Sequence, residues 1–286
     1  MNYNTTGNNS WLFQKAYYNG FVWNNNKLEP YAPDFFRQRL GWIKSVHLSN
    51  VMNEKSDTHI KLKTTYPGLV TGIGVTHQSK SKGELMLGFE FDYTTGMPVI
   101  RGHSLKGALR SAFPQKQNRD VKHKPEKAYQ IYCWLNRLTF TGEGLMEFQN
   151  TQGLYETVVS YENEIFDGKI NGRLISNYKQ DVFFDSYISK ASLFPSTRNQ
   201  YLGDDSITPH VKRGIPYEQA MLTDPIPLPF LKILPCIEIE FRFKLHENGL
   251  LSIENKKNLF KEILMNQGIG AKTNLGYGQF EASPPV

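Results

Sequence analysis

The pattern of apolar and polar positions predicts five strands along the chain. Apolar residues alternate at 85–93 and 236–245, residues 59–76 are rich in Thr, Val and Ile, residues 181–188 contain a short apolar run, and residues 279–282 are short enough for a closing strand. Because successive side chains of a strand point to opposite faces, this period of two is typical of strands with one buried face. The clearest run alternates polar residues with Ile237, Ile239, Phe241 and Phe243. Asp185 stands inside the otherwise apolar run at 181–188, where we expect a carboxylate to be buried and paired.

Apolar residues three and four positions apart predict helices between these runs. The helical patterns cover residues 34–51, 104–113, 124–137 and 255–267. Asp34 and Ser104 stand where a side chain would cap the first two helices, and Pro114 ends the second. The last pattern is amphipathic, with one face formed by Leu259, Phe260, Ile263 and Leu264.

The order of these elements indicates the fold class. We expect insertions at about residues 115–180 and 189–225, with irregular strands over residues 139–180. Without the insertions the order is strand, helix, strand, strand, helix, strand, which is the ferredoxin-like α+β pattern that RNA-recognition modules share. We therefore expect an aromatic and helical extension over residues 1–50 and a single ferredoxin-like domain over residues 51–286.

The N-terminal extension carries an aromatic cluster that admits two interpretations. Its members are Trp11, Phe13, Tyr17, Tyr18, Phe21 and Trp23. Aromatic rings stack on unpaired bases, so the cluster could be a platform for single-stranded nucleic acid. Clusters of this kind more often belong to a core or a protein interface, and this is the interpretation that we favour.

The composition limits the classes of protein that fit. The chain has 286 residues, of which 39% are hydrophobic, so a sizeable core can form. Its two cysteines, Cys133 and Cys236, have no metal-binding spacing and fit a reduced, cytoplasmic protein. No stretch approaches the ~20 apolar residues of a membrane span, and residues 1–10 lack the features of a signal peptide. The sequence indicates no cofactor.

Basic residues are concentrated in one segment. The net charge is +6, and residues 101–127 contain eight Lys or Arg against only Asp120 and Glu126. This segment alone therefore accounts for a charge of +6. A solvated basic face would explain it, but such clustering is also the electrostatic footprint of nucleic-acid binding.

Residues 268–278, Gly-Ile-Gly-Ala-Lys-Thr-Asn-Leu-Gly-Tyr-Gly, form a glycine-rich loop. Glycine permits positive φ and a close approach of the backbone, and successive N–H groups of such a loop can hold an anion beside Lys272. The pattern of a nucleotide-binding P-loop fails, because Ala271 precedes the lysine and a strand follows the loop. A tight turn that packs the last strand is the alternative to an anion cradle.

A second feature that favours anions is expected at residues 101–110. Helix N-termini attract anions, and the small residues Gly102, Gly107 and Ala108 would allow a ligand to approach the predicted helix closely. Lys106 and Arg110 lie four positions apart and therefore share one face of that helix.

Two of these stretches together resemble a known family. Residues 97–110, Met-Pro-Val-Ile-Arg-Gly-His-Ser-Leu-Lys-Gly-Ala-Leu-Arg, resemble the P-x-I-P-G-S-S-L-K-G-x-x-R segment of the RAMP superfamily, the repeat-associated proteins of CRISPR effector complexes. Residues 268–278 resemble the C-terminal glycine-rich loop of that family. Arg101 and His103 depart from the pattern, since proline and serine are usual at those positions.

A narrower resemblance points to one branch of the superfamily. Residues 183–185, 205–210 and 225–230 are similar to the sixth subunit of type III-B (Cmr) complexes. Together the similarities run from about residue 69 to residue 280, which is most of the chain.

The resemblance implies a non-catalytic, RNA-binding subunit of a type III-B CRISPR RNA-guided interference complex, which acts in antiviral defence. Such a subunit lies near the 3′ end of the guide RNA, packs on neighbouring RAMP subunits and meets the target RNA only indirectly. It needs no membrane. The residues expected to contact RNA, mainly its phosphate backbone, are Arg101, His103, Ser104, Lys106, Arg110, Gly268, Gly270, Lys272, Thr273, Gly276 and Tyr277.

An enzyme is the main alternative. Some RAMP proteins process CRISPR RNA without metal, using histidine as general acid or base, so a metal-independent endoribonuclease is conceivable here. The candidates are His77, His103, His123 and His210, with His103 foremost because it is expected beside the phosphate site. We predict no enzyme, since no second acid or base pairs with it in the sequence.

Two further alternatives stay open. Asp204 and Asp205 could bind a hard cation, although a polar loop is the simpler interpretation of that dipeptide. The chain could also be a structural adaptor that contacts only protein neighbours, for which the aromatic N-terminal segment would be suited.

Overall fold

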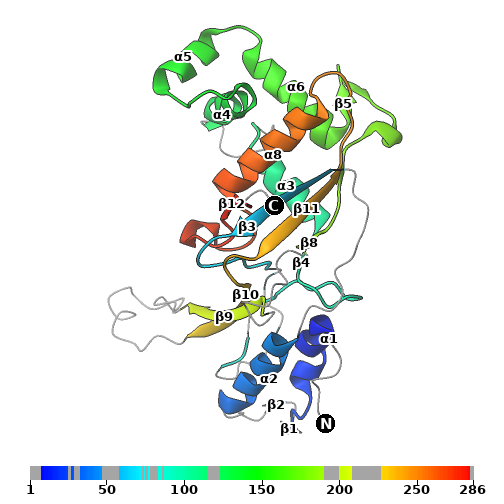
Figure 1. Ribbon diagram of the computed structural model, residues 1–286, viewed down its shortest axis with the longest axis vertical. Helices are drawn as coiled ribbons and strands as arrows, with labels where there is room; N and C mark the ends of the chain where they lie inside the picture. Colours follow the sequence, from blue (N-terminus) through cyan, green and yellow to red (C-terminus); the bar gives the residue numbers. More distant parts are fainter. Residues whose placement is uncertain are drawn as a thin grey trace.

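The computed structural model of the protein describes residues 8–24, 27–28, 33–46, 58–72, 74, 77, 83–85, 87–114, 123–189, 200–207 and 227–283. The molecule is elongated, with a sheet at its centre and a group of helices at each end (Figure 1).

An antiparallel sheet forms this centre. Its strands lie in the order β12 (Phe280–Ala282), β3 (Thr58–Thr64), β11 (Glu238–Lys244), β8 (Ser186–Ile188) and β4 (Val99–Ile100), and β7 (Val182–Phe183) also pairs with β11. The pairing of β3 with β11 sets Leu62 opposite Ile239 and Ile60 opposite Phe241. Apolar side chains of the two strands therefore share one face of the sheet.

Two helices cover that apolar face. α3 (Gly102–Ser111) follows β4, and α8 (Ile253–Gln267) lies between β11 and β12. Along the chain the order β3, α3, β8, β11, α8, β12 is the ferredoxin-like βαββαβ sequence, and in space its four strands lie in the order four, one, three, two. The predicted fold class is thus confirmed.

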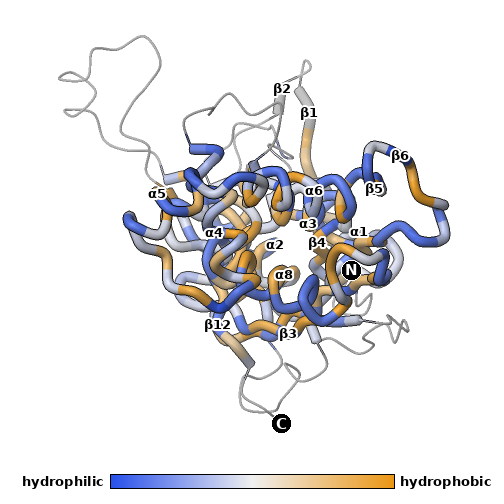
Figure 2. Tube along the Cα trace, turned by 90° about the horizontal axis from the view of Figure 1, so that it is seen from above, coloured by the Kyte–Doolittle hydropathy of each residue, from blue (hydrophilic) through white to orange (hydrophobic). Residues whose placement is uncertain are grey.

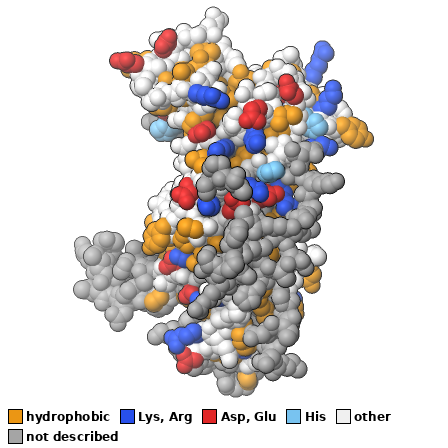
Figure 3. All heavy atoms as spheres, viewed as in Figure 1, with side chains coloured by type: hydrophobic (Ala, Val, Ile, Leu, Met, Phe, Trp, Pro, Cys, Tyr) orange, Lys and Arg blue, Asp and Glu red, His pale blue; other side chains and the backbone are white. Residues whose placement is uncertain are grey.

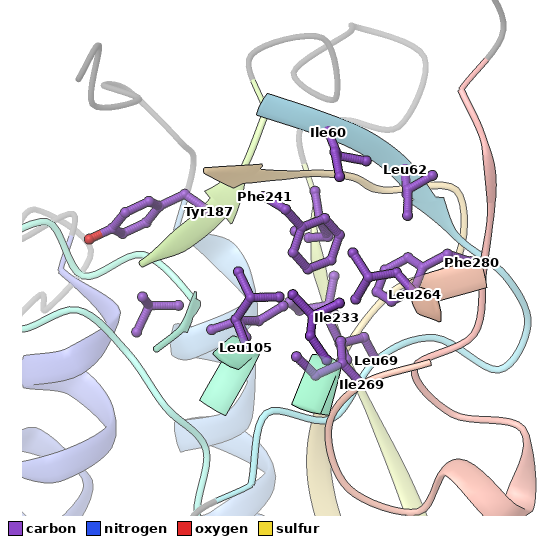
Figure 4. Packing of buried hydrophobic residues seen from close by; sticks show 14 of the residues in the cluster. Ile60, Leu62, Leu69, Leu105, Tyr187, Ile233, Phe241, Leu264, Ile269 and Phe280 are labelled. Atoms are coloured by element: carbon purple, nitrogen blue, oxygen red, sulfur yellow. The ribbon is translucent and has the colours of Figure 1, made fainter. Parts of the chain in front are cut away.

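The main core lies between the sheet and these helices. Leu105 of α3 and Leu264 of α8 point toward Phe241 and Leu62, and all four side chains are fully buried (Figure 4). Burial of such a side chain contributes about 1.5–3 kcal/mol. In the view along the long axis, hydrophobic segments gather around α8, α3 and β4 near the centre of the projection (Figure 2).

A helical cluster occupies the end of the molecule where irregular strands were expected. It comprises α4 (Lys124–Asn136), α5 (Gly142–Asn150) and α6 (Leu154–Asp167), followed by the two-residue strands β5 (Lys169–Ile170) and β6 (Arg173–Leu174) and the 3₁₀ turn η4 (Asn177–Lys179). The helix predicted at 124–137 is confirmed. The prediction of strands over 139–180 was wrong for residues 142–150 and 154–167, which are helical, and only β5 and β6 are strands in that range. Gly153 and Gly168, which suggested interrupted strands, instead cap the two ends of α6 with positive φ.

Two predicted strands are altered by their surroundings. Within the described residues the run at 85–93 forms no strand, although Phe91 makes an isolated bridge with Pro98. Phe89 and Phe91 of this run are nevertheless buried. The alternating pattern therefore correctly indicated which side chains are buried, but not that the segment pairs as a strand. The run at 181–188 divides into β7 and β8, because Asp185 between them turns to α3 instead of the sheet.

The opposite end contains α1 (Asn9–Gln14), η2 (Ala16–Tyr18) and α2 (Pro33–Ser45), with the short strands β1 (Trp23–Asn24) and β2 (Lys27–Leu28). Phe13 and Tyr17 are fully buried, and Tyr17 packs on the rings of Phe36 and His77. For these residues the core interpretation of the aromatic cluster is confirmed. The helix starts at Pro33, so the expected cap Asp34 lies in its first turn.

A two-stranded ribbon lies beside the glycine-rich loop. It pairs β9 (Leu202–Ile207) with β10 (Leu228–Ile233), so the polar loop that the sequence had suggested at Asp204 and Asp205 is a strand. Asp204 of β9 forms an ion pair with Lys44 of α2, with 2.6 Å between Nζ and Oδ1. The ribbon therefore joins the N-terminal extension to the rest of the molecule.

One buried lysine connects three parts of the fold. Lys256 of α8 is fully buried, and its Nζ lies 2.8 Å from both Glu164 of α6 and Asp181 before β7. The same ammonium donates to the carbonyl oxygen of His246 at 2.7 Å. A buried charge is tolerated only with such partners, so these elements constrain one another.

No helix in the described part of the chain is long and apolar enough to cross a membrane.

Candidate nucleic-acid interface

The start of α3 is held by an internal carboxylate. The helix begins at Gly102 with Arg101 as N-cap, so the prediction that Ser104 caps it was wrong. Asp185 accepts a hydrogen bond from the Gly102 N–H at 2.7 Å and another from Arg101 Nη1 at 2.9 Å. A Cβ at position 102 would overlap the carbonyl oxygen of Phe183, which explains the glycine. Asp185 thus acts as the anion for the first N–H of this helix.

The next residues of α3 remain available to a ligand. His103 and Ser104 are exposed, and no described residue accepts a hydrogen bond from either backbone N–H. The Nζ of Lys106 lies 5.7 Å from the centre of the Phe183 ring and forms no ion pair within the described part of the chain. This side of the helix combines open N–H groups with an unneutralised cation, which suits an anion.

The two arginines of the segment are committed to carboxylates instead. Arg101 Nε donates to Glu90 Oε1 at 2.8 Å. Arg110 binds Asp167 through both terminal nitrogens at 2.8 and 3.0 Å, and its Nε reaches Glu162 at 3.3 Å. For each arginine, partial burial works to lower the pKa, but these hydrogen bonds outweigh it and the pKa is raised. The positive charge of residues 101–110 is therefore largely balanced from within.

The rest of the basic segment is only partly described. Lys116, Arg119 and Lys122 lie outside the described residues, and Lys127 donates to the carbonyl oxygen of Ser111 at 2.9 Å. On the face shown in Figure 3, acidic side chains gather near the end that holds α5, and both signs of charge mix over the centre. A uniformly basic surface is not visible on this face.

The glycine-rich loop follows α8 and is anchored by backbone hydrogen bonds. Ile269 N–H donates to Gly278 at 3.0 Å, Gly278 N–H to Gly68 at 2.8 Å, and Ala271 N–H to Val70 at 2.9 Å. A Cβ at Gly278 would overlap the carbonyl oxygen of Ile269, and φ there is 68°. The loop is therefore the tight turn that was considered as an alternative, and Gly268 is buried within it.

The half-buried lysine of this loop, Lys272, stands at its centre. Lys272 has a φ of 63° and precedes the 3₁₀ turn η7 (Thr273–Leu275), which Gly276 ends. Its Nζ lies 5.4 Å from the centre of the Phe230 ring, and no described residue forms an ion pair with it. A turn that packs the last strand and a lysine free to meet an anion are thus combined in one loop.

Tyr277 faces the interior rather than a ligand. Its side chain is buried, and its hydroxyl donates to Asp205 Oδ2 at 2.7 Å, where Lys232 Nζ also binds at 2.6 Å. Burial, and then the hydrogen bond to Asp205, raise the pKa of the Tyr277 hydroxyl. The residue therefore fastens the loop to the β9–β10 ribbon, and an RNA contact through its side chain is not what its position indicates.

A pocket of about 260 Å³ lies where the two predicted motifs meet. The α3 motif supplies Arg101, Ser104 and Ala108, and the glycine-rich loop supplies Ile269 and Gly270. The remaining lining comes from Thr71, Gly72, Glu90, Val99 and Ile100. Two stretches separated by some 160 positions in the sequence thus form one site, which we call the α3–loop pocket.

The histidine and metal alternatives find little support in the geometry. His77 is fully buried, with one ring nitrogen 2.8 Å from the Phe13 carbonyl oxygen and the other 2.8 Å from that of Leu85. His123 pairs with Glu126, and His210 lies outside the described residues. The described residues contain no group of three or more His, Cys, Asp or Glu side chains that could hold a metal.

Sequence reasoning missed the acidic and backbone members of the site. Glu90, Thr71 and Gly72 were not singled out, and the role of Asp185 was not identified. A signal for Asp185 was present, since a carboxylate within an apolar run requires a partner. Glu90 was missed because residues 85–93 were predicted to be a strand, in which Glu90 would be one of the ordinary solvent-facing polar positions. That strand does not form.

The comparison with protein families gives one match. The model of the RAMP superfamily matches residues 61–281. No curated protein sequence matches the chain.

Several solved structures are similar to the chain. A chain in the cryo-EM structure of the type III-B Cmr-beta complex bound to cognate target RNA is 20% identical, with 92% of this chain and 69% of that chain covered and a TM-score of 0.45. The crystal structure of Cmr6 from Pyrococcus furiosus is 22% identical, with coverages of 79% and 97% and a TM-score of 0.43. A chain of a type IV-B CRISPR complex is 13% identical, with coverages of 80% and 95% and a TM-score of 0.34.

Proposed function

The chain belongs to the RAMP superfamily, and from this premise we propose that it is a non-catalytic subunit of a type III-B CRISPR RNA-guided interference complex. It binds the 3′-end region of the guide RNA through the phosphate backbone and packs on neighbouring RAMP subunits. Residues 51–286 form the RAMP domain in this proposal, and residues 1–50 are an extension of it.

The observation that carries the proposal is the α3–loop pocket. Its two sides are the stretches in which the sequence resembles the family. Each stretch also carries, outside the pocket lining, a lysine without an ion pair among the described residues, Lys106 and Lys272. The N–H groups of His103 and Ser104 add donors on the α3 side. Backbone donors and lysines bind phosphates without reading sequence, which suits a subunit that must accept any guide.

The arginines have a different place in this proposal. Arg101 and Arg110 hold α3 to Glu90, Asp185 and Asp167, so their main role is structural. The exposed His103 and Ser104 and the half-buried Lys106 and Lys272 remain the proposed RNA contacts, with Thr273 and Gly276 shaping the loop. Because no acid or base in the described part of the chain forms a hydrogen bond or ion pair with the His103 side chain, we do not assign the molecule endoribonuclease activity.

The test is RNA binding as a function of salt. Lys106→Ala and Lys272→Ala should each weaken binding to single-stranded RNA of any sequence, and each should reduce the slope of log K against log salt by about 0.7. Fluorescence anisotropy with a labelled RNA across a salt series measures both effects. Lys169→Ala is the matched control, since this exposed lysine lies on β5 at the far end of the molecule.

Two outcomes would contradict the proposal. If the slope of log K against log salt is unchanged in both Lys106→Ala and Lys272→Ala, the phosphate contacts lie elsewhere. If the RNA is cut at discrete positions in the presence of EDTA and cutting is lost in His103→Ala, the chain is a processing nuclease instead.

A further inference from the structure

The α3–loop pocket has a shape that phosphate contacts do not require. A volume of about 260 Å³ lies below the roughly 300–1,000 Å³ of sites for drug-sized ligands. Phosphates bind at open surfaces, whereas this hollow extends between α3, the glycine-rich loop and residues 71–72. Its size suits one planar heterocycle.

The walls of the pocket are largely apolar or flat. Val99, Ile100, Ala108 and Ile269 contribute aliphatic surface, and Gly72 and Gly270 bring bare backbone to the lining. At Gly270 a Cβ would overlap the Val70 carbonyl oxygen, so this position must present its peptide plane without a side chain. Aliphatic groups and peptide planes can sandwich the two faces of a ring.

The polar end of the pocket consists of a hydrogen-bond acceptor, the Glu90 carboxylate, beside a donor, the Arg101 guanidinium. Glu90 Oε1 is held by Arg101 Nε at 2.8 Å, and Glu90 Oε2 has no hydrogen-bond partner among the described residues. Arg101 Nη1 is bound to Asp185, while its Nη2 also lacks a partner in the described part of the chain. A phosphate would be repelled by the Glu90 carboxylate, so the ligand of this end carries N–H donors and a carbonyl.

We propose that the α3–loop pocket binds one guanine base extruded from the bound RNA, an inference that rests on the proposed function. Guanine presents two neighbouring N–H donors, which match the Glu90 carboxylate, next to the O6 acceptor, which matches the Arg101 guanidinium. RNA-binding proteins commonly read splayed bases on these edges. Ser104 lines this pocket and has an open backbone N–H group, so a base in the pocket and a phosphate of the same nucleotide would lie at one place.

The experiment compares RNAs that differ in one base. Anisotropy is measured with an eight-nucleotide uridine RNA and with the same RNA carrying a central guanosine, inosine or adenosine. Loss of one hydrogen bond to a charged group corresponds to roughly tenfold in affinity. We therefore expect the inosine RNA, which lacks the 2-amino group, to bind roughly tenfold more weakly than the guanosine RNA, and the uridine RNA to bind more weakly still.

Glu90→Gln should remove the preference for guanosine, because the carboxylate that accepts the two N–H donors of the base is lost. It should leave the affinity for the uridine RNA within about twofold, because an amide oxygen can still accept the hydrogen bond from Arg101 Nε and Asp185 also holds Arg101. Glu240→Gln is the matched control, since Glu240 is also a carboxylate paired with an arginine, Arg242, but lies on β11 outside the pocket. It removes the same charge and should retain the preference.

A second variant guards against a folding defect in Glu90→Gln. Ala108→Leu fills the pocket from α3 with a residue of high helix propensity and alters no charged group. It should also abolish the preference for guanosine while the salt-dependent binding of the uridine RNA persists. Circular dichroism confirms that each variant is folded.

The possible results separate the two proposals. Binding of all four RNAs with equal affinity, or a preference that survives both pocket variants, overturns the base-binding inference and leaves the proposed function standing. Failure to bind any RNA at low salt overturns the proposed function, and the base-binding inference falls with it.

Discussion

The two rims of the α3–loop pocket are held in place by different interactions. On the α3 rim, side chains do the work, as Asp185 binds the Gly102 N–H and Arg101, and Asp167 binds Arg110. On the loop rim, which is the glycine-rich loop, backbone hydrogen bonds from the N–H groups of Ile269, Ala271 and Gly278 hold the structure in place. Both rims present a lysine without an ion pair in the described part of the chain.

This difference teaches where each rim is vulnerable. Because the loop is held by closely packed backbone groups, its glycines have no room for a Cβ atom. A substitution that adds a Cβ there should therefore destabilise the loop. A side-chain anchor depends on charge, so the α3 rim should fail when a carboxylate is removed. Lys106 and Lys272 contribute to neither anchor, so we expect that each can be replaced without loss of the fold.

The largest effect is expected on the loop rim. Gly278→Ala places a Cβ against the Ile269 carbonyl oxygen at a φ of 68°, so it should lower the free energy of unfolding by about 3–4 kcal/mol. Urea denaturation measures the change. Gly172→Ala is the control, since its φ is 77° with open space around the site, and it should cost only about 1 kcal/mol. Equal losses in the two variants would show that close packing does not hold the loop.

A smaller loss is expected on the α3 rim. Asp185→Ala removes the acceptor for the Gly102 N–H and one partner of Arg101, and it should cost about 2 kcal/mol in the same assay. Asp34→Ala removes a carboxylate that pairs with Arg37 on the exposed face of α2, and its effect should be much smaller. If the two variants behave alike, the internal carboxylate does not position α3.

The smallest effect concerns the one charged anchor of the loop rim. Burial works to raise the pKa of Asp205, but hydrogen bonds from Lys232 and Tyr277 outweigh it and lower the pKa. A carboxylate whose pKa is lower in the folded state than in the unfolded state stabilises the fold at pH values above its unfolded-state pKa, which is about 3.9. This stabilisation is lost as the pH falls through the folded-state pKa.

The difference in Tm between the wild type and Asp205→Asn should therefore be full at pH 6 and shrink below pH 4. Thermal unfolding at both pH values tests it. A difference that stays constant from pH 6 to pH 3 would mean that the charge of Asp205 does not hold the loop.

Local pattern was sufficient for the elements whose side chains face a single core. β3, β11, α3, α8 and β12 were located from apolar spacing, and their order gave the ferredoxin-like class. α5 and α6 were missed because glycines at helix ends resemble breaks in strands when only the sequence is read. Gly153 and Gly168 take a left-handed conformation as caps, which depends on where the helix stops.

For the site, the motifs could be found but not their partners. Arg101 and Asp185 are 84 positions apart, and Arg110 and Asp167 are 57 apart. Nothing local indicates which carboxylate meets which arginine, because the pairing is fixed only by packing. The sequence therefore overstated the free positive charge at 101–110, and it could not show that this segment and the glycine-rich loop share a pocket.

The buried Lys256 bears on how this domain can have been elaborated. Its ammonium needs Glu164, which belongs to the helical insertion, as well as Asp181 beside the sheet. Excising the insertion would remove one of the two carboxylates and leave Lys256 paired with Asp181 alone. The helices at 124–167 are therefore part of the ion cluster that holds α8, and a minimal version of the domain would have to keep both members of the remaining Lys256–Asp181 pair.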